Sequence, residues 1–181
     1  MDTPTVSVAL LGDYGVGKTA LTIQMVIGIF ENDCDPTIED IYRIVFTKDD
    51  ITIVLQILDT AGGDLPMRIP SIIRNYTLFF CVYSVTSRYS FDYIMKEIAR
   101  ILELKEKQPY FIILVGNKSD LEFDRQISFE EGLHSANEIN VLFAETSAKD
   151  RQSVHDAFSK LILHANLSNF GIESKKEEKI K

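Results

Sequence analysis

The stretch GDYGVGKT, residues 12–19, decides how this chain folds. It fits the pattern G-x-x-x-x-G-K-[ST] of a loop that binds the phosphates of a nucleoside triphosphate, and we call it the phosphate loop. The preceding residues 6–11, VSVALL, are almost wholly apolar, which is typical of a strand buried on both faces of a parallel sheet. The following residues 20–25, ALTIQM, favour a helix. A strand, this loop and a helix in that order predict a nucleotide-binding α/β domain.

The residue types of the phosphate loop suit the chemistry of phosphate binding. Its glycines let the backbone wrap around an anion, and the N–H groups at the positive end of the following helix point toward it. We expect the Lys18 ammonium to contact the β- and γ-phosphates and the Thr19 hydroxyl to bind Mg²⁺.

Bulk composition narrows the class of protein. The chain has 181 residues, of which 45% are hydrophobic and 25% are charged, as in an ordinary globular domain. Its net charge of −8 argues against a nucleic-acid partner, which requires a basic face. The sequence has no apolar run near the ~20 residues of a membrane span and no signal-peptide pattern, so we expect a cytoplasmic protein. The two cysteines, Cys34 and Cys81, are too few for a disulfide framework or a zinc site.

Strands and helices alternate along the rest of the chain. Apolar runs and alternating patterns predict strands over 41–46, 51–58, 78–85, 110–115 and 141–144. The first two of these form an antiparallel hairpin. Helical periodicity begins near Ser90, Ser128 and Ser153, and we expect these serines to cap three helices. This order predicts a doubly wound α/β fold, in which ligands bind at the carboxyl ends of the strands.

Two polar motifs directly follow predicted strands and add to the nucleotide site. In DTAG, residues 59–62, the Asp59 carboxylate can hold the water shell of Mg²⁺, and the Gly62 N–H can meet the γ-phosphate. In NKSD, residues 117–120, which we call the base loop, the Asp120 carboxylate can accept hydrogen bonds from both N1–H and the 2-amino group of guanine. Adenine lacks this donor pair, and an unpaired charged acceptor costs about 1–3 kcal/mol or more. Taken alone, each motif is also compatible with an ordinary solvated turn.

Two weaker signals complete the pattern. TSAK, residues 146–149, offers a backbone N–H to the guanine oxygen and a lysine stem over the base. In DPTIED, residues 35–40, Pro36 forces the preceding residue into extended geometry, which presents the Thr37 hydroxyl and N–H to Mg²⁺ and the γ-phosphate. Read without this context, residues 35–40 are equally an acidic surface loop.

These five motifs occur in the order and approximate spacing found in Ras small GTPases, and the sequence resembles that family from about residue 6 to residue 167, most closely its Ras/Rap branch. The resemblance implies a P-loop NTPase G domain over 1–168, with a mostly parallel six-stranded sheet, one antiparallel strand and five flanking helices. A charged tail over 169–181 follows it. The resemblance further implies a monomeric molecular switch that binds GTP or GDP with Mg²⁺ and hydrolyses GTP. Its implied partners are effector proteins at the switch I surface, residues 33–42, together with exchange factors and GTPase-activating proteins.

The resemblance also implies roles for individual residues. Lys18, Thr37 and Gly62 act at the γ-phosphate during catalysis. Thr19 and Thr37 ligate Mg²⁺, and Asp59 acts through a water molecule of the metal. The implied nucleotide-binding residues are Asp13, Tyr14, Gly15, Val16, Gly17, Lys18, Thr19, Ala20, Phe30, Pro36, Thr37, Gly62, Asn117, Lys118, Asp120, Leu121, Ser147, Ala148 and Lys149.

Two departures from the family pattern bear on hydrolysis. Gly63 stands where members usually carry the glutamine that orients the attacking water, and a glycine cannot hold a water molecule. Tyr14 stands where Ras-branch members have glycine, and its ring crowds the gap through which an activating protein inserts an arginine. We therefore expect slow hydrolysis and a bias toward the GTP-bound state. The alternative is a hydrolysis-deficient pseudo-GTPase that acts as a constitutively GTP-bound binding module; a P-loop ATPase or kinase is disfavoured by the base loop.

Three further departures concern the mobile parts of the family fold. The segment 63–70 is one residue shorter than in the family and contains Pro66 and Pro70, so we expect its helix to begin near Pro70, where the first turn tolerates proline. Cys34 replaces a tyrosine that closes over the nucleotide, which predicts faster nucleotide release. The sequence has no C-a-a-X cysteine, so attachment to the inner face of the plasma membrane requires a lipidated tail beyond residue 181.

Overall fold

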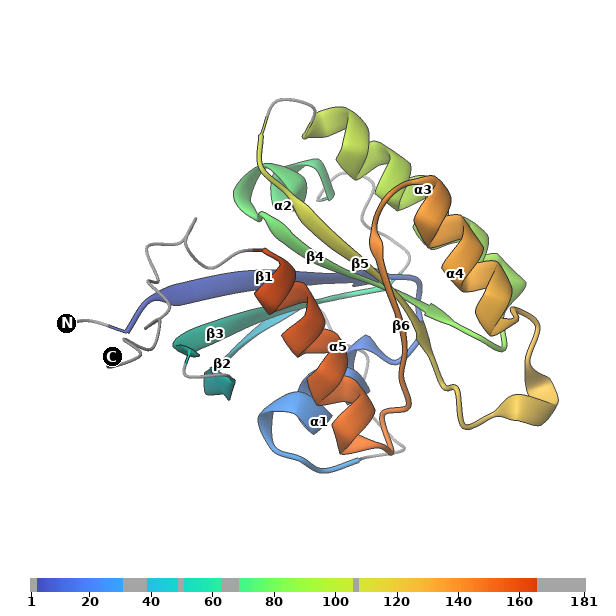
Figure 1. The fold of residues 1–181 in the computed structure, drawn as a ribbon, viewed down its shortest axis with the longest axis horizontal. Coiled ribbons are helices and arrows are strands. Elements are labelled where there is room, and N and C mark those ends of the chain that lie inside the picture. The colour runs from blue at the N-terminus through green and yellow to red at the C-terminus, as the bar shows by residue number, and fades with distance from the viewer. Residues whose placement is uncertain (1–2, 31–38, 49–50, 63–68, 106–107, 166–181) are drawn as a thin grey trace, which may run out of the picture.

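The computed structural model describes residues 3–30, 39–48, 51–62, 69–105 and 108–165 (Figure 1). A six-stranded sheet runs through the middle of the molecule in the order β2-β3-β1-β4-β5-β6. β2 pairs antiparallel with β3, and the other neighbouring strands are parallel. The strands are β1 (Thr5–Gly12), β2 (Glu39–Lys48), β3 (Ile51–Thr60), β4 (Leu78–Ser84), β5 (Phe111–Asn117) and β6 (Leu142–Glu145).

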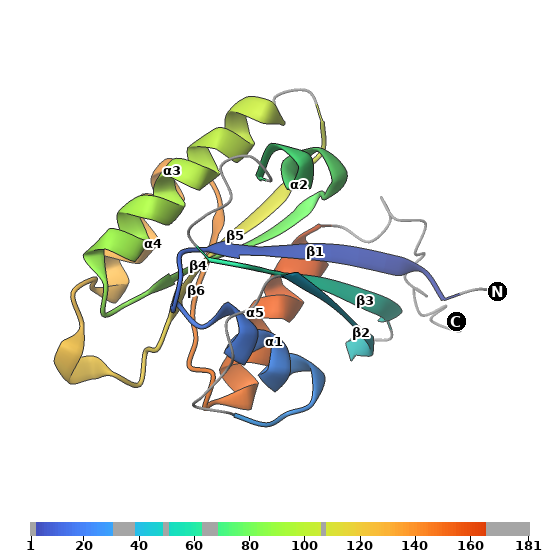
Figure 2. The ribbon, with the colours of Figure 1, turned by 180° about the vertical axis from the view of Figure 1, so that it is seen from behind.

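Helices form a layer on each face of the sheet, as Figures 1 and 2 show from opposite sides. α1 (Lys18–Val26) and α5 (Arg151–His164) cover one face. α2 (Ile69–Asn75), α3 (Arg88–Leu104) and α4 (Phe129–Glu138) cover the other. A short 3₁₀ helix, Glu122–Asp124, follows β5. Within the described ranges, the predicted α/β class, the six strands and the five α-helices are confirmed.

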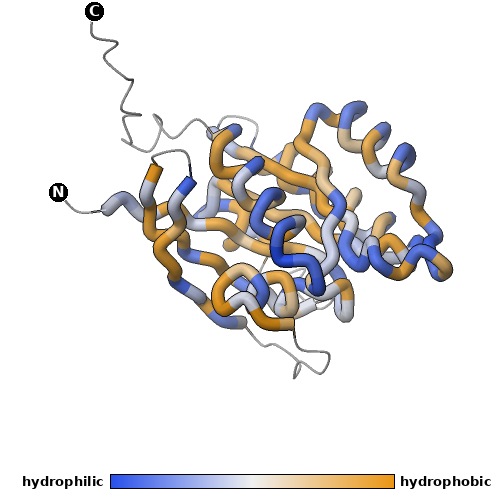
Figure 3. Tube along the Cα trace, turned by 60° about the horizontal axis from the view of Figure 1, so that its bottom comes forward, coloured by the Kyte–Doolittle hydropathy of each residue, from blue (hydrophilic) through white to orange (hydrophobic). Residues whose placement is uncertain are grey.

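The alternation of side chains along the strands explains the two helical layers. In β1, Val6, Val8 and Leu10 belong to the core beneath α1 and α5. Ala9 and Leu11 point the other way, into the core beneath α2, α3 and α4. All seven residues of β4 are buried, because this central strand is covered on both faces. Figure 3 shows apolar residues concentrated along the strands, whereas polar and apolar residues alternate along the helices that surround them.

Two of the three predicted helix caps are wrong. The N-cap of α3 is Ser87 rather than Ser90, and the N-cap of α5 is Asp150 rather than Ser153. Both misassigned serines lie three positions after the true cap, and each donates its hydroxyl back to the cap carbonyl at 2.8 Å. The predicted cap of α4, Ser128, is confirmed.

The predicted antiparallel hairpin is confirmed. β2 and β3 pair over ten residues each, a longer hairpin than predicted, and β2 is an edge strand of the sheet. α2 is described over Ile69–Asn75 and contains Pro70, whereas residues 63–68, which include Pro66, and Cys34 lie outside the described residues, so the predicted start of this helix stays a prediction. Among the described helices, none has both the length and the apolar character needed to cross a bilayer.

Tyr83, near the end of β4, places a polar atom in the core beneath α2, α3 and α4. Its side chain is fully buried, and its ring packs edge-on against Phe91 with centroids 4.9 Å apart. The phenol hydroxyl has no hydrogen-bond partner among the described residues. Gly116 and Gly132 leave room for it, because a Cβ at either position would collide with the phenol oxygen. Burial raises the pKa of Tyr83, so the hydroxyl stays neutral.

Replacing Tyr83 by phenylalanine is expected to raise the free energy of unfolding by about 1 kcal/mol, because a buried hydroxyl without a partner costs about 1–3 kcal/mol. Urea denaturation at fixed nucleotide and Mg²⁺ concentrations measures the change.

Ser90→Ala is the matched control. The Ser90 hydroxyl is also buried, but it accepts from the Ser84 N–H at 3.0 Å and donates to the Ser87 carbonyl at 2.8 Å. Its removal should lower the free energy of unfolding by about 1 kcal/mol. A Tyr83→Phe protein that is less stable than the wild type would mean that the phenol hydroxyl has a partner.

Candidate functional site

The phosphate loop connects the carboxyl end of β1 to the first turn of α1 (Figure 1). Lys18 begins α1 and is 6% exposed, and its ammonium donates to the carbonyl oxygens of Gly12 at 3.0 Å and Asp13 at 2.9 Å. Gly17 caps the helix with φ 98°, where a residue with a Cβ is strained and would also collide with the Asn117 amide. The loop therefore encloses a cation at a helix N-terminus, the arrangement that binds phosphate.

The charges of Lys18 and Asp59 are coupled inside this loop. Burial lowers the pKa of Lys18 to about 8, although the carboxylates of Asp59 and Asp13 act in the opposite direction. Burial also raises the pKa of Asp59, and nearby Asp40 adds to this. The Thr19 hydroxyl and the Lys18 ammonium oppose it by favouring the ionised carboxylate. Burial destabilises the charged form of each side chain, and the opposite charge of the other side chain offsets part of this destabilisation.

The surroundings of Asp59 fit a magnesium ion. Both of its carboxylate oxygens are fully buried and have no hydrogen bond of standard geometry within the described residues. The hydroxyl of Thr19 lies close enough to favour the ionised carboxylate, so two oxygen donors of the kind that Mg²⁺ prefers meet beside the phosphate loop. In the described ranges no cluster of three His, Cys, Asp or Glu side chains could hold a metal. Ligands of a cation here beyond Asp59 and Thr19 are left to phosphate, to water and to Thr37, which lies outside the described residues.

DTAG packs directly onto the phosphate loop. A Cβ at Gly62 would overlap the backbone of Tyr14 and Asp13, so only glycine permits this approach. The Tyr14 side chain is 70% exposed and projects from the loop into solvent. Three predicted site residues, Pro36, Thr37 and Gly63, lie outside the described residues.

The base loop follows β5 and braces the phosphate loop. The Asn117 side-chain amide donates to the Val16 carbonyl at 2.8 Å and accepts from the Thr146 hydroxyl at 3.2 Å. The Lys118 ammonium donates to the Gly15 carbonyl at 2.7 Å, and Lys118 itself has a left-handed backbone with φ 64°. These bonds join three of the predicted motifs. The sequence motif predicted contacts with the base and gave no sign of this bracing role.

Asp120 is held as an ionised acceptor by two donors from the TSAK segment. Its carboxylate accepts from the Ser147 hydroxyl at 2.7 Å and from the Lys149 ammonium at 2.8 Å. Burial acts to raise the pKa of Asp120, but these hydrogen bonds outweigh it and lower the pKa. The Lys149 ammonium also lies 5.7 Å from the centre of the Phe30 ring. Phe30, Asp120 and Lys149 thus lie together although they come from three distant parts of the sequence.

The remaining predicted residues lie around these contacts. Val16 is buried in the core and Ala20 is half-buried in α1. Leu121 is 38% exposed and precedes the 3₁₀ helix. Ala148 is almost fully buried behind the base loop.

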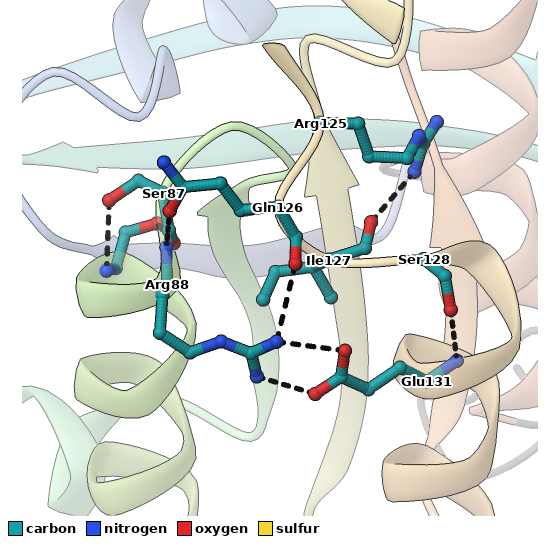
Figure 4. A network of polar contacts seen from close by, with 8 residues as sticks. Ser87, Arg88, Arg125, Gln126, Ile127, Ser128 and Glu131 are labelled. Carbon is teal, nitrogen blue, oxygen red and sulfur yellow. Dashed lines mark hydrogen bonds and ion pairs between the residues drawn. The ribbon is translucent and has the colours of Figure 1, made fainter. Parts of the chain in front are cut away.

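Two arginines that the sequence analysis did not single out anchor the segment after the base loop (Figure 4). Arg125 forms a two-pronged ion pair with Glu145 at the end of β6, at 2.7 and 3.0 Å. Arg88, at the start of α3, pairs with both carboxylate oxygens of Glu131 and donates to the Gln126 carbonyl at 3.2 Å. No local sequence pattern predicts that Glu131 pairs with an arginine 43 positions away.

Comparison with known proteins agrees with this geometry. A family model described as Ras family matches residues 7–166. Ras-like protein 1 of Saccharomyces cerevisiae is 45% identical over 157 residues, which cover 86% of this chain and 50% of the yeast protein, so the chain spans about half of that relative's length.

Two proteins of Dictyostelium discoideum are similarly related. Ras-like protein rasU is 44% identical over 161 residues, covering 86% of this chain and 73% of that protein. Ras-like protein rasW is 42% identical over 158 residues, covering 87% and 73%. With the phosphate loop, DTAG, the base loop and TSAK assembled on the expected mostly parallel six-stranded sheet, these matches show that the chain belongs to the Ras family of small GTPases.

Proposed function

We propose that this protein is a guanine-nucleotide-dependent switch that binds GTP or GDP with Mg²⁺, hydrolyses GTP slowly and signals to effectors through switch I. The observation that carries the proposal is the pair of hydrogen bonds from Asn117 and Lys118 to the carbonyls of Val16 and Gly15. They fix the base loop to the phosphate loop, so that a ligand with both a purine and a phosphate chain meets both ends of one rigid site.

The base end of the site favours guanine for an electrostatic reason. Asp120 is kept ionised by Ser147 and Lys149, and an ionised carboxylate is an acceptor without a proton to donate. Guanine offers N1–H and a 2-amino group to such an acceptor, whereas adenine presents an unprotonated N1. Adenine would therefore leave the carboxylate desolvated and unpaired.

The phosphate end combines fixed charges with oriented backbone. Lys18 and the first N–H groups of α1 bind the phosphates, with Thr19 and Asp59 on the side where Mg²⁺ fits. When bound, Mg²⁺ neutralises the phosphate charge that develops during transfer to water. Thr37, proposed as a further ligand, belongs to the segment outside the described residues.

Slow hydrolysis is proposed from Tyr14 and Gly63. The phenol ring of Tyr14 projects from the phosphate loop, where it obstructs an arginine supplied by an activating protein. Gly63 supplies no side chain to orient the attacking water. If the protein lacks both the orientation of the attacking water and the response to an activating arginine, it is a constitutively GTP-bound binding module. Tyr14 and Gly63 also favour this second candidate function.

Effectors are proposed to bind along the open edge of β2. A partner strand can add to this edge through main-chain hydrogen bonds. Exposed Asp40 lies at its start, and the sequence adds Asp33, Asp35 and Glu39, so a partner with basic side chains is complementary. Exchange factors and GTPase-activating proteins are the other proposed partners of a monomer acting in the cytoplasm, with membrane attachment through a lipidated tail.

Substitution Asp120→Asn tests the purine preference. The wild type should bind GDP at least 100-fold more tightly than ADP in calorimetric titrations, because ADP leaves Asp120 unpaired. The Asp120→Asn protein should lose most of its GDP affinity and gain affinity for xanthosine diphosphate, whose 2-oxo group accepts from the new amide.

Glu122→Gln is the matched control for this experiment, since Glu122 is an exposed carboxylate two positions away in the 3₁₀ helix. It should leave the GDP preference unchanged. Equal affinity of the wild type for GDP and ADP would contradict guanine recognition altogether.

The double substitution Tyr14→Gly with Gly63→Gln tests the cause of slow hydrolysis. Single-turnover hydrolysis of bound GTP should be at least tenfold faster in the double variant, because it regains a water-orienting side chain and an open phosphate loop. Phosphate release from preloaded protein measures the rate. A wild-type rate equal to that of the double variant would contradict the assigned cause, and no hydrolysis by either would favour the binding-module function.

A further inference from the structure

A glutamine of α1 reaches the TSAK segment across the core. Gln24 is 4% exposed, and its side-chain nitrogen donates to the Ala148 carbonyl at 2.6 Å, across 124 positions of sequence. Because a carbonyl oxygen can only accept, the atom facing it is the amide nitrogen rather than the oxygen. The Gln24 oxygen is buried and has no hydrogen-bond partner in the described part of the chain, so this one bond is the polar contact that orients the side chain.

One backbone N–H group of residues 146–150 has no acceptor among the residues that the structure describes. The other four N–H groups are hydrogen-bonded within the protein. Thr146 donates to the Gly116 carbonyl at 2.9 Å, and Ser147 donates to the Ser153 hydroxyl at 3.2 Å. Lys149 donates to the Ser147 hydroxyl at 3.2 Å, and Asp150 donates to the Ser147 carbonyl at 2.9 Å. For the N–H of Ala148 the described residues provide no acceptor. Ala148 is 6% exposed, so this donor lies where a ligand would have to satisfy it.

Gln24 fixes the direction of that free donor. The peptide between Ala148 and Lys149 is held from both sides, its carbonyl by Gln24 and its N–H by the Ser147 hydroxyl. The Ser147 carbonyl of the preceding peptide accepts from the Asp150 N–H. With both flanking peptides held, the torsions of Ala148 are set, and its N–H points in one direction.

The same segment connects to purine recognition through Asp120. The Ser147 hydroxyl that accepts from the Lys149 N–H also donates to the Asp120 carboxylate. The free Ala148 N–H and the Asp120 carboxylate are therefore a donor and an acceptor held by one hydrogen-bonded unit. The edge of guanine offers the complementary set, a 6-oxo acceptor beside the N1–H donor.

We propose that Gln24 is a positioning residue for purine recognition, which aims the Ala148 N–H at the 6-oxo group of guanine. The inference rests on the proposed guanine-nucleotide function. Gln24 lies six positions after Lys18 on one helix, a rise of about 9 Å. The same helix thus carries Lys18, which is proposed to bind the phosphates, at its start. Near its end it carries Gln24, which is proposed to orient the Ala148 N–H.

Substitution Gln24→Met tests this role, since methionine has a similar length and lacks the donor. Release of a fluorescent GDP analogue should be about tenfold faster, because the Ala148 carbonyl loses its partner and the donor loses its direction. The matched control is Thr22→Val on the same helix. Thr22 is fully buried with a hydroxyl that has no partner among the described residues, so its replacement should leave release unchanged.

A comparison of GDP with 6-thio-GDP separates positioning from general loosening. Sulfur accepts hydrogen bonds more weakly than oxygen, so the wild type and Thr22→Val should bind GDP more tightly than 6-thio-GDP. In Gln24→Met this preference should shrink by about threefold or more, because the donor no longer reads the 6-position. Faster release with an unchanged oxygen preference, or unchanged release, would overturn the inference.

Two further measurements keep the test decisive. If Gln24→Met does not fold, Gln24→Leu replaces it, since leucine also lacks a donor for the Ala148 carbonyl and the same two results are expected. The preference for GDP over ADP, which depends on Asp120, is measured for every variant. A wild type without that preference would contradict the proposed function, whereas a wild type with it and a Gln24 variant identical to the wild type would overturn only the role of Gln24.

Discussion

The interaction on which the rest of the site depends is the attachment of the base loop to the phosphate loop. Asn117 and Lys118 donate to the carbonyls of Val16 and Gly15, which belong to the tight loop between β1 and α1. Without these bonds the two loops would be separate ends of separate strands. With them, the two loops are held in one fixed arrangement, as a site for a ligand with both a base and a phosphate chain would need.

The electrostatics of the two ends differ in a way that suits their tasks. Lys18 and Asp59 are buried, and each has its pKa shifted toward the neutral form by burial and back toward the charged form by the other. Such a pair responds strongly to added charges, because little water is present to screen them. Asp120 lies nearer the surface, and direct hydrogen bonds from Ser147 and Lys149 keep it ionised. Burial thus has the largest effect on the pKa values at the phosphate end, whereas direct hydrogen bonds determine the pKa of Asp120 at the base end.

The sequence was sufficient for the fold and for the motifs that gather around the phosphate loop, because each of these follows from a local pattern. Apolar runs identified the strands, and the motif residues had to lie at strand ends. The caps of α3 and α5 were misassigned because a serine in the first turn and a serine at the cap have the same local signature. Gln24 and Arg88 were missed because their partners are 124 and 43 positions away, and no local pattern encodes such a pairing. The segments that hold Thr37 and Gly63 remain predictions from the sequence alone.

The two arginine anchors of Figure 4 differ in their exposure to solvent, and this has a consequence for how the segment after the base loop behaves in different media. The side chains of Arg88 and Glu131 are 45% and 39% exposed, whereas those of Arg125 and Glu145 are 15% and 13% exposed. Dissolved ions screen exposed pairs far more than shielded ones. As ionic strength rises, the attachment at α3 and α4 weakens first, while the tether to β6 persists. Concentrated salt therefore loosens the outer turn of this segment and spares its attachment to the end of β6.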